Sequence, residues 1–157
     1  MYKYKTEPFK HQRQSLMEGA KPHNFAYFME MGTGKTKVAI DNAAYLFQDQ
    51  KIDYVFVIAP NSVYQNWKKE IDIHCPEETN IYIWKVTKDK TFKMDVKKLT
   101  YVLMNVEALS HASGKKWLES KLQKHGMRSM IILDESTSIK NLKASRTKAI
   151  IKLGQLA

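Results

Sequence analysis

The chain has 157 residues, of which 43% are hydrophobic, so it is long enough for one domain with a packed core. It has no apolar stretch that could span a membrane and no signal-peptide pattern, and its single cysteine, Cys75, cannot form an internal disulfide. We therefore predict no membrane contact and no secretion, and a reducing compartment, either cytoplasm or nucleoid or nucleus. The formal net charge of +10 suits a polyanion partner, although a solvated lysine-rich surface explains it as well.

Short apolar runs alternate with longer amphipathic stretches along the chain. The runs that resemble buried strands are residues 24–28, 54–59, 81–84, 101–104 and 129–133. The stretches with helical periodicity are 35–48, 62–74, 115–124 and 142–153. Strands that alternate with helices imply right-handed crossovers, so we predict an α/β fold with a mainly parallel sheet and helices on both faces.

A glycine-rich loop follows the first apolar run, and residues 29–36 read Met-Glu-Met-Gly-Thr-Gly-Lys-Thr. Gly32 and Gly34 leave room for backbone N–H groups to point at phosphates, and the helix that starts here adds its positive end. Lys35 supplies a charge for the β- and γ-phosphates, and Thr36 offers a hydroxyl to Mg²⁺. The loop therefore predicts a nucleotide triphosphate site.

The loop departs from the general phosphate-binding pattern, which has a glycine where this chain has Met29. The alternative interpretation is a glycine-rich turn that only starts a helix. A second motif favours the phosphate-binding interpretation. Asp134 and Glu135 close the apolar run 130–133, as expected where a buried parallel strand opens into a crevice. Asp134 is suited to hold Mg²⁺ and Glu135 to orient and deprotonate an attacking water.

The start of the second helical stretch and its tryptophan have simpler interpretations. Ser62 precedes Gln65 by three residues, which is a capping-box pattern and predicts that the helix begins at Ser62. Val63, Trp67 and Ile71 follow at helical spacing, so we interpret Trp67 as a core residue.

In this order the motifs resemble the first RecA-like lobe of superfamily-two helicases, most of all the Snf-type DNA translocases related to chromatin remodellers. The resemblance covers nearly the whole chain, and within that family Met29 is not a departure. The segments that carry it are Phe9–Gln12, Glu30–Thr36, Ile58–Ser62 with Asn66 and Trp67, Asn105–Leu109, and Asp134–Asn141.

The resemblance implies a role for each matching residue. Catalysis would fall to Lys35, Asp134 and Glu135, and Mg²⁺ to Thr36 and Asp134. The expected nucleotide contacts are Gln12, which would read the adenine edge, and Gly32, Thr33, Gly34, Lys35 and Thr36. The expected nucleic-acid contacts are Pro60, Asn61, Ser62 and Asn105. Ser136 and Thr137 depart from the family's D-E-A-H/Q box, which puts the coupling role of Thr137 in question.

The family's next element would be a T-G-T-P-like motif and a second RecA-like lobe with arginine fingers, which this sequence does not contain. We therefore expect residues 1–157 to be a single N-terminal ATP-binding lobe that uses ATP, Mg²⁺ and DNA, with RNA left open. We expect a second lobe in the full-length chain or in trans, and slow hydrolysis without it. The alternatives are a self-contained P-loop ATPase or kinase that does not act on nucleic acid, and a non-catalytic nucleic-acid-binding module.

Overall fold

The computed structural model describes residues 2–22, 25–27, 29–30, 32–60, 63–85, 97–125, 128–134 and 145–155. Its helices are α1 (Lys10–Gly19), α2 (Lys35–Gln48), α3 (Tyr64–His74), α4 (Ala112–His125), α5 (Ser145–Gly154) and the short 3₁₀ helix η2 (Val106–Ser110). Its strands are β1 (Tyr54–Ala59), β2 (Thr79–Ile83), β3 (Leu99–Asn105) and β4 (Ser129–Leu133).

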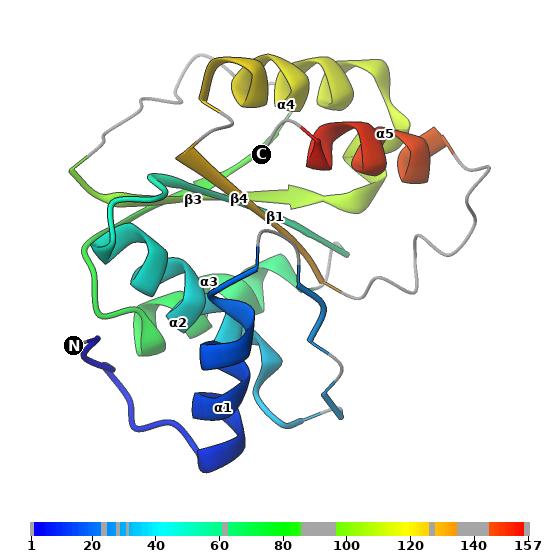
Figure 1. Ribbon diagram of the computed structural model, residues 1–157. Helices are drawn as coiled ribbons and strands as arrows, with labels where there is room; N and C mark the ends of the chain where they lie inside the picture. The colour runs from blue at the N-terminus through cyan, green and yellow to red at the C-terminus, as the bar shows by residue number, and fades with distance from the viewer. Residues whose placement is uncertain are drawn as a thin grey trace.

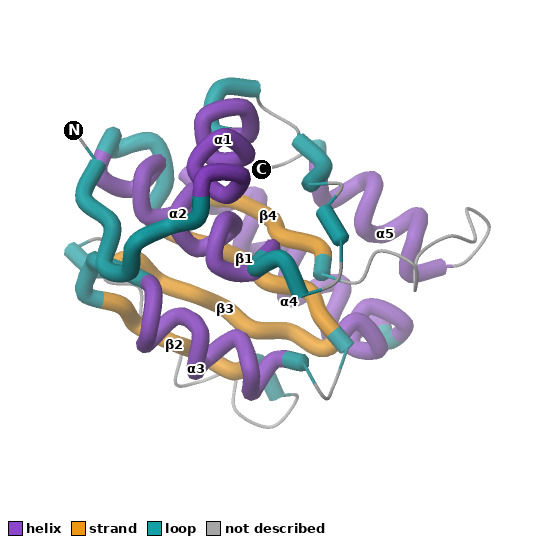
Figure 2. The backbone as a smooth tube through the Cα atoms, turned by 90° about the horizontal axis from the view of Figure 1, so that it is seen from below, coloured by secondary structure: helices purple, strands orange, loops and turns teal. Residues whose placement is uncertain are grey.

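The four strands form one sheet in the order β2-β3-β1-β4, and every neighbouring pair is parallel. Helices α1, α2 and α3 lie on one face, and α4 and α5 lie on the other (Figure 1). Figure 2, seen from the side of α1, α2 and α3, shows the strands running beneath these helices. The predicted α/β fold with a parallel sheet between two helical layers is confirmed.

Burial of the strands follows from this order. β1 lies between two other strands and two helical layers, and all six of its residues are buried. Val55, Val57 and Ala59 pack with α2 and α3, whereas alternate residues such as Phe56 pack with α4. A strand covered on both faces needs apolar side chains in both directions, which explains its unbroken apolar run. The outer strand β2 is only half-buried, as are Met130–Leu133 of β4.

The prediction of a strand at residues 24–28 is wrong where the structure can test it. Residues 25–27 form no strand, while His23, Asn24 and Phe28 lie outside the described residues. Phe25 is 45% exposed, and the Tyr27 hydroxyl accepts a hydrogen bond from Asn42 Nδ2 of α2 at 3.1 Å. Tyr27 therefore anchors this segment to α2. A short apolar run in the sequence looks the same whether it forms a strand or such an anchor.

The beginning of α3 also differs from the prediction. The helix begins at Tyr64 with Val63 at the N-cap position, two residues later than predicted. Ser62, for which the capping box was predicted, lies outside the described residues. The N–H of Val63 donates to the Pro60 carbonyl at 2.9 Å, directly before the helix. The other predicted helices match α2, α4 and α5 to within a few residues, apart from 142–144, which lie outside the described residues.

Candidate nucleotide site

The loop before α2 has the backbone conformation that a phosphate cradle requires. Gly32 and Gly34 have φ angles of 78° and 81°, in the left-handed region that glycine tolerates best. Thr33 closes the turn, since its N–H and its hydroxyl both donate to the Glu30 carbonyl, at 3.4 and 2.6 Å. The positive φ angles therefore favour glycine at both positions. The absence of side chains there also leaves space for phosphate groups.

Helix α2 presents an uncapped N-terminus to this loop. Gly34 is at the N-cap position and has no side chain with which to cap, and the first turn contains no acidic residue. The leading N–H groups of such a helix attract anions. The Lys35 ammonium group adds a positive charge at the same place, where it donates to the carbonyls of Met29 at 2.9 Å and Glu30 at 3.2 Å. This combination is suited to bind phosphate groups.

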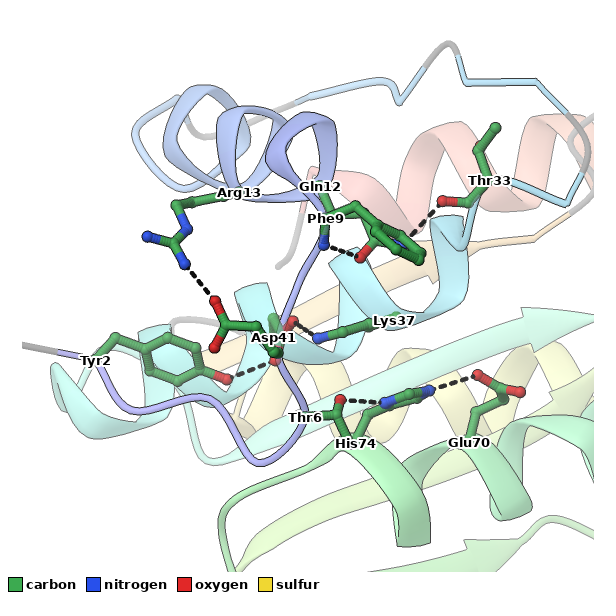
Figure 3. Close-up of polar contacts among 11 residues, drawn as sticks. Tyr2, Thr6, Phe9, Gln12, Arg13, Thr33, Lys37, Asp41, Glu70 and His74 are labelled. Atoms are coloured by element: carbon green, nitrogen blue, oxygen red, sulfur yellow. Dashed lines mark hydrogen bonds and ion pairs between the residues drawn. The ribbon is translucent and has the colours of Figure 1, made fainter.

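Gln12 links α1 to the loop. Its side chain is only 4% exposed, which excludes a simple surface role. The Oε1 atom accepts from the Phe9 N–H at 3.0 Å, and Nε2 donates to the Thr33 carbonyl at 3.0 Å (Figure 3). A Cβ at Gly34 would lie 2.3 Å from Gln12 Nε2, so the glycine also permits this approach. The predicted contact of Gln12 with adenine stays a prediction, because both ends of its amide already bond to the protein.

Asp134 lies directly after β4, at the carboxyl end of the sheet. Its N–H donates to the Ile58 carbonyl at 3.0 Å, which extends the β1–β4 pairing by one residue. Its Oδ2 accepts from the indole Nε1 of Trp67 at 2.7 Å. Trp67 is 1% exposed, so its interpretation as a core residue is confirmed, but its hydrogen bond to Asp134 was not predicted. Glu135 lies outside the described residues.

The predicted nucleic-acid residues end neighbouring strands. Pro60 follows β1 and Asn105 ends β3, and the register pairs Ala59 with Asn105, so these two positions lie side by side at the carboxyl edge. Asn61 and Ser62 lie outside the described residues. The Asn105 Oδ1 accepts from the Glu107 N–H at 2.8 Å and caps η2. Asn105 thus has a structural role, and its contact with nucleic acid stays a prediction.

A buried polar network behind the loop was missed from the sequence. Lys37 and Asp41, one turn apart on α2, form an ion pair of 2.6 Å with side chains only 7% and 2% exposed. The Tyr2 hydroxyl donates to Asp41 Oδ1 at 2.8 Å (Figure 3). Burial, together with the nearby Asp41 carboxylate, raises the pKa of Tyr2 above its ordinary value. The spacing of Lys37 and Asp41 is a signal for an i,i+4 pair, but it does not indicate burial.

A second set of contacts fixes the N-terminal segment to α3. Thr6 Oγ1 lies 2.5 Å from His74 Nδ1, and His74 Nε2 lies 3.2 Å from a carboxylate oxygen of Glu70 (Figure 3). Lys5 Nζ donates to the Asp72 carbonyl at 2.7 Å. Residues 2–7 thereby connect α2 with α3.

The oxygen ligands at this site suit Mg²⁺ that is bound together with a nucleotide. Among the described residues, no group of three or more His, Cys, Asp and Glu side chains could hold a metal ion. Mg²⁺ in nucleotide sites is bound through one or two carboxylates, water and the phosphates themselves. Asp134 and the hydroxyl of Thr36 are protein ligands of the right chemistry.

No helix in the described part of the chain is both long and apolar enough to cross a membrane.

A phosphate-binding loop before a helix, beside a parallel sheet that ends in Asp134, defines the class of P-loop nucleotide-binding α/β domains. Residues 16–156 match the family model of the SNF2-related domain. The chain belongs to this family, and the predicted resemblance to the Snf-type lobe is confirmed.

Curated relatives agree with this assignment. The chromatin-remodeling ATPase INO80 of Schizosaccharomyces pombe is 32% identical over 133 residues, which cover 78% of this chain and 8% of that protein. A mouse SWI/SNF-related regulator of chromatin, of the subfamily A containing DEAD/H box 1, is 43% identical over 47 residues, or 30% of this chain and 5% of that protein. The chain thus spans less than a tenth of the length of these relatives.

A solved structure has the same fold. The Sulfolobus solfataricus SWI2/SNF2 ATPase core in complex with double-stranded DNA is similar with a TM-score of 0.71 at 20% identity. The match covers 95% of this chain and 30% of that chain. At this identity the likeness demonstrates the shared fold of a RecA-like lobe.

Proposed function

We propose that this chain is the ATP-binding lobe of an Snf-type DNA translocase, which couples ATP hydrolysis to movement on DNA. The proposal includes a second RecA-like lobe, in the full-length chain or in trans, that closes on the nucleotide. Closure of two lobes can move a nucleic-acid strand in steps. The second lobe would also supply arginine fingers, which contribute about 10³–10⁵-fold in the rate of phosphoryl transfer.

The loop and α2 would bind the nucleotide in this mechanism. N–H groups of residues 32–36 and the Lys35 ammonium would surround the β- and γ-phosphates, and Gln12 would contact the adenine. Bound Mg²⁺ would neutralise charge that develops on the transferred phosphoryl group. Thr36 and Asp134 would supply its protein ligands. Glu135 would orient the attacking water and accept its proton.

The nucleic-acid surface would lie where β1 and β3 end. Pro60 and Asn105 are neighbours at this edge, and Asn61 and Ser62 follow Pro60 in the chain. Contacts there would be made to the backbone of duplex DNA, so binding would be sensitive to salt and largely independent of sequence. The net charge of +10 supports a polyanion partner. The protein would act in a reducing compartment that contains DNA, such as the cytoplasm with its nucleoid, or the nucleus.

The observation that carries the proposal is the start of α2. Two glycines with positive φ lead into an uncapped helix whose first residue is Lys35, within a chain that belongs to the SNF2-related family. A turn that only started a helix would not need two glycines with positive φ, nor a lysine whose ammonium group contacts the loop carbonyls.

The test is ATP hydrolysis with and without duplex DNA, by this chain alone and joined to a second lobe of the same family. We expect slow turnover from the chain alone and DNA-stimulated turnover from the two-lobed protein. Lys35→Ala should lower the stimulated rate by roughly 10²-fold or more, because a charge that stabilises the transition state is lost.

The matched control is Lys51→Ala. Lys51 lies just beyond the other end of α2, roughly 20 Å away, in an exposed ion pair with Asp49. This variant should keep full activity. Fast DNA-independent turnover by the chain alone, lost in Glu135→Gln, would instead support the self-contained P-loop enzyme. Equal rates for Lys35→Ala and Lys51→Ala would overturn the nucleotide site itself.

A further inference from the structure

A closed ring of hydrogen bonds joins the carboxyl ends of β1 and β4 through α3. The Val63 N–H donates to the Pro60 carbonyl at 2.9 Å, and the Trp67 N–H donates to the Val63 carbonyl at 3.1 Å. The Trp67 indole Nε1 then donates to Asp134 Oδ2 at 2.7 Å. The Asp134 N–H closes the ring on the Ile58 carbonyl at 3.0 Å, two residues before Pro60.

This ring fixes Asp134 at two points. Its backbone is bonded to β1, and its carboxylate is bonded to an indole that is 1% exposed and packed with Ile71 and Ala59 in the core. A rotation of the carboxylate away from this position would break this hydrogen bond and leave a buried indole N–H without its acceptor. The side-chain direction of Asp134 therefore depends on where α3 places Trp67.

An indole is well suited to hold a carboxylate that binds a metal. It is a neutral donor that cannot accept a proton or bind Mg²⁺ itself, and a carboxylate that accepts one hydrogen bond retains further lone pairs. Groups that hydrogen-bond to a metal ligand set its direction, and their loss typically costs about 10–100-fold in metal affinity or activity. A buried indole N–H normally has an acceptor, and here that acceptor is the carboxylate at the end of β4.

We propose that Trp67 is a positioning residue that directs Asp134 toward Mg²⁺ and, through Val63, links the metal to Pro60 at the end of β1. The inference rests on the proposed function of both sites. Residues 60–62 are the proposed nucleic-acid contact, and α3 begins four residues after Pro60. A displacement of Pro60 on DNA binding would be passed to Val63 and Trp67 through these backbone hydrogen bonds, and with them to the indole. The ring would thus connect DNA binding to the ATP site through α3.

The first test compares two matched substitutions in the two-lobed protein. Trp67→Phe keeps a buried aromatic ring and removes the N–H donor. Trp117→Phe makes the same change at a tryptophan that is 7% exposed on the opposite face of the sheet. The measurements are the Mg²⁺ concentration that gives half-maximal hydrolysis, kcat and KM for ATP, and the ratio of rates with and without duplex DNA.

We expect Trp67→Phe to raise the half-maximal Mg²⁺ concentration by roughly 10-fold and to reduce the stimulation by DNA. Nucleotide binding in EDTA should be unchanged, because the phosphate loop is intact. Trp117→Phe should behave as wild type in each measurement. An unchanged Mg²⁺ dependence in folded Trp67→Phe would overturn the inference while leaving the proposed function intact. A wild-type protein without Mg²⁺-dependent ATP binding would instead contradict the proposed function.

A second measurement needs no variant at position 67 and decides the case in which Trp67→Phe does not fold. The indole N–H resonance of Trp67 can be observed in ¹⁵N-labelled chain and assigned by difference from Trp84→Phe and Trp117→Phe. We expect this resonance to shift when Mg²⁺ is added to the nucleotide-bound chain. A nucleotide-bound chain whose Trp67 resonance does not respond to Mg²⁺ would overturn the inference.

Discussion

The two helical layers of this domain differ in the contacts between their elements. On the side of α1, α2 and α3, directed polar contacts cross between elements, such as Tyr2–Asp41, Gln12–Thr33 and Trp67–Asp134. On the side of α4 and α5, large aromatic rings dominate, and Trp117 stacks with Tyr82 at a centroid distance of 6.0 Å.

The difference corresponds to the positions of the candidate sites. Hydrogen bonds depend on distance and direction, so they fix the position and orientation of a side chain. Apolar burial depends mainly on area and tolerates small shifts. Both layers contribute buried apolar area. The layer that contains the phosphate loop adds directed contacts that fix the geometry around that loop. Substitutions in the two layers should accordingly have different consequences for nucleotide binding.

The largest effect on stability is expected from Trp117→Ala in the aromatic layer. Replacing a buried tryptophan by alanine typically costs about 3–5 kcal/mol of unfolding free energy, because it removes apolar contact and leaves a cavity. Urea unfolding would measure this loss. The fraction that stays folded should bind ATP as wild type does. A large fall in ATP affinity of the folded fraction would contradict the division of roles between the layers.

The buried ion pair tests the polar layer. Asp41→Ala should cost about 3 kcal/mol, because Lys37 would be left as a buried charge without its carboxylate partner, and because the Tyr2 hydroxyl would lose its acceptor. Unlike Trp117→Ala, this change lies in the helix that follows the phosphate loop, about two turns from it, and should also lower the ATP affinity of the folded protein.

The control for this substitution is the double variant Lys37→Met/Asp41→Leu. Replacing both partners by apolar residues removes the unpaired charge, so most of the lost stability should return. Thermal unfolding and nucleotide titration of both variants would check these outcomes. A double variant no more stable than Asp41→Ala would show that Asp41 contributes mainly through Tyr2.

The sheet could be predicted because its central strands are covered on both faces. The apolar runs 54–59 and 101–104 match β1 and most of β3, since burial in both directions leaves an unbroken apolar signal. The helix α1 was not predicted, because one of its three buried residues is the polar Gln12. The run at 24–28 misled for the opposite reason, since the apolar Phe25 is largely exposed.

The phosphate loop could be predicted because its function needs fixed residue types at adjacent positions. Glycine, lysine and threonine at positions 32–36 are determined by local backbone path and phosphate chemistry. The contact between Trp67 and Asp134 joins residues 67 positions apart, and that between Tyr2 and Asp41 joins residues 39 apart. Such contacts depend on the packing of α3 and the N-terminal segment, which no local pattern specifies.

The smallest effect on stability is expected at the loop glycines, where two substitutions separate backbone strain from crowding. Gly32→Ala would place a side chain at a φ of 78° with no atom within 4 Å of the new Cβ. Gly34→Ala has a similar φ of 81° and adds a contact of 2.3 Å with Gln12 Nε2. Each should lose about 1–2 kcal/mol from backbone strain alone.

Only Gly34→Ala should also displace Gln12 from Thr33, so it should lower ATP affinity more than Gly32→Ala does. Adding Gln12→Ala distinguishes the two causes. If crowding is responsible, Gln12→Ala should weaken ATP binding less in the Gly34→Ala protein than in the wild type, because Gln12 is already displaced there. Isothermal titration of the four proteins with Mg²⁺ and ATP would measure this coupling. If the losses of ATP affinity in the two single variants simply add in the double variant, Gln12 does not lose its role when Gly34→Ala crowds it. The position of Gln12 would then matter less for ATP binding than its hydrogen bonds indicate.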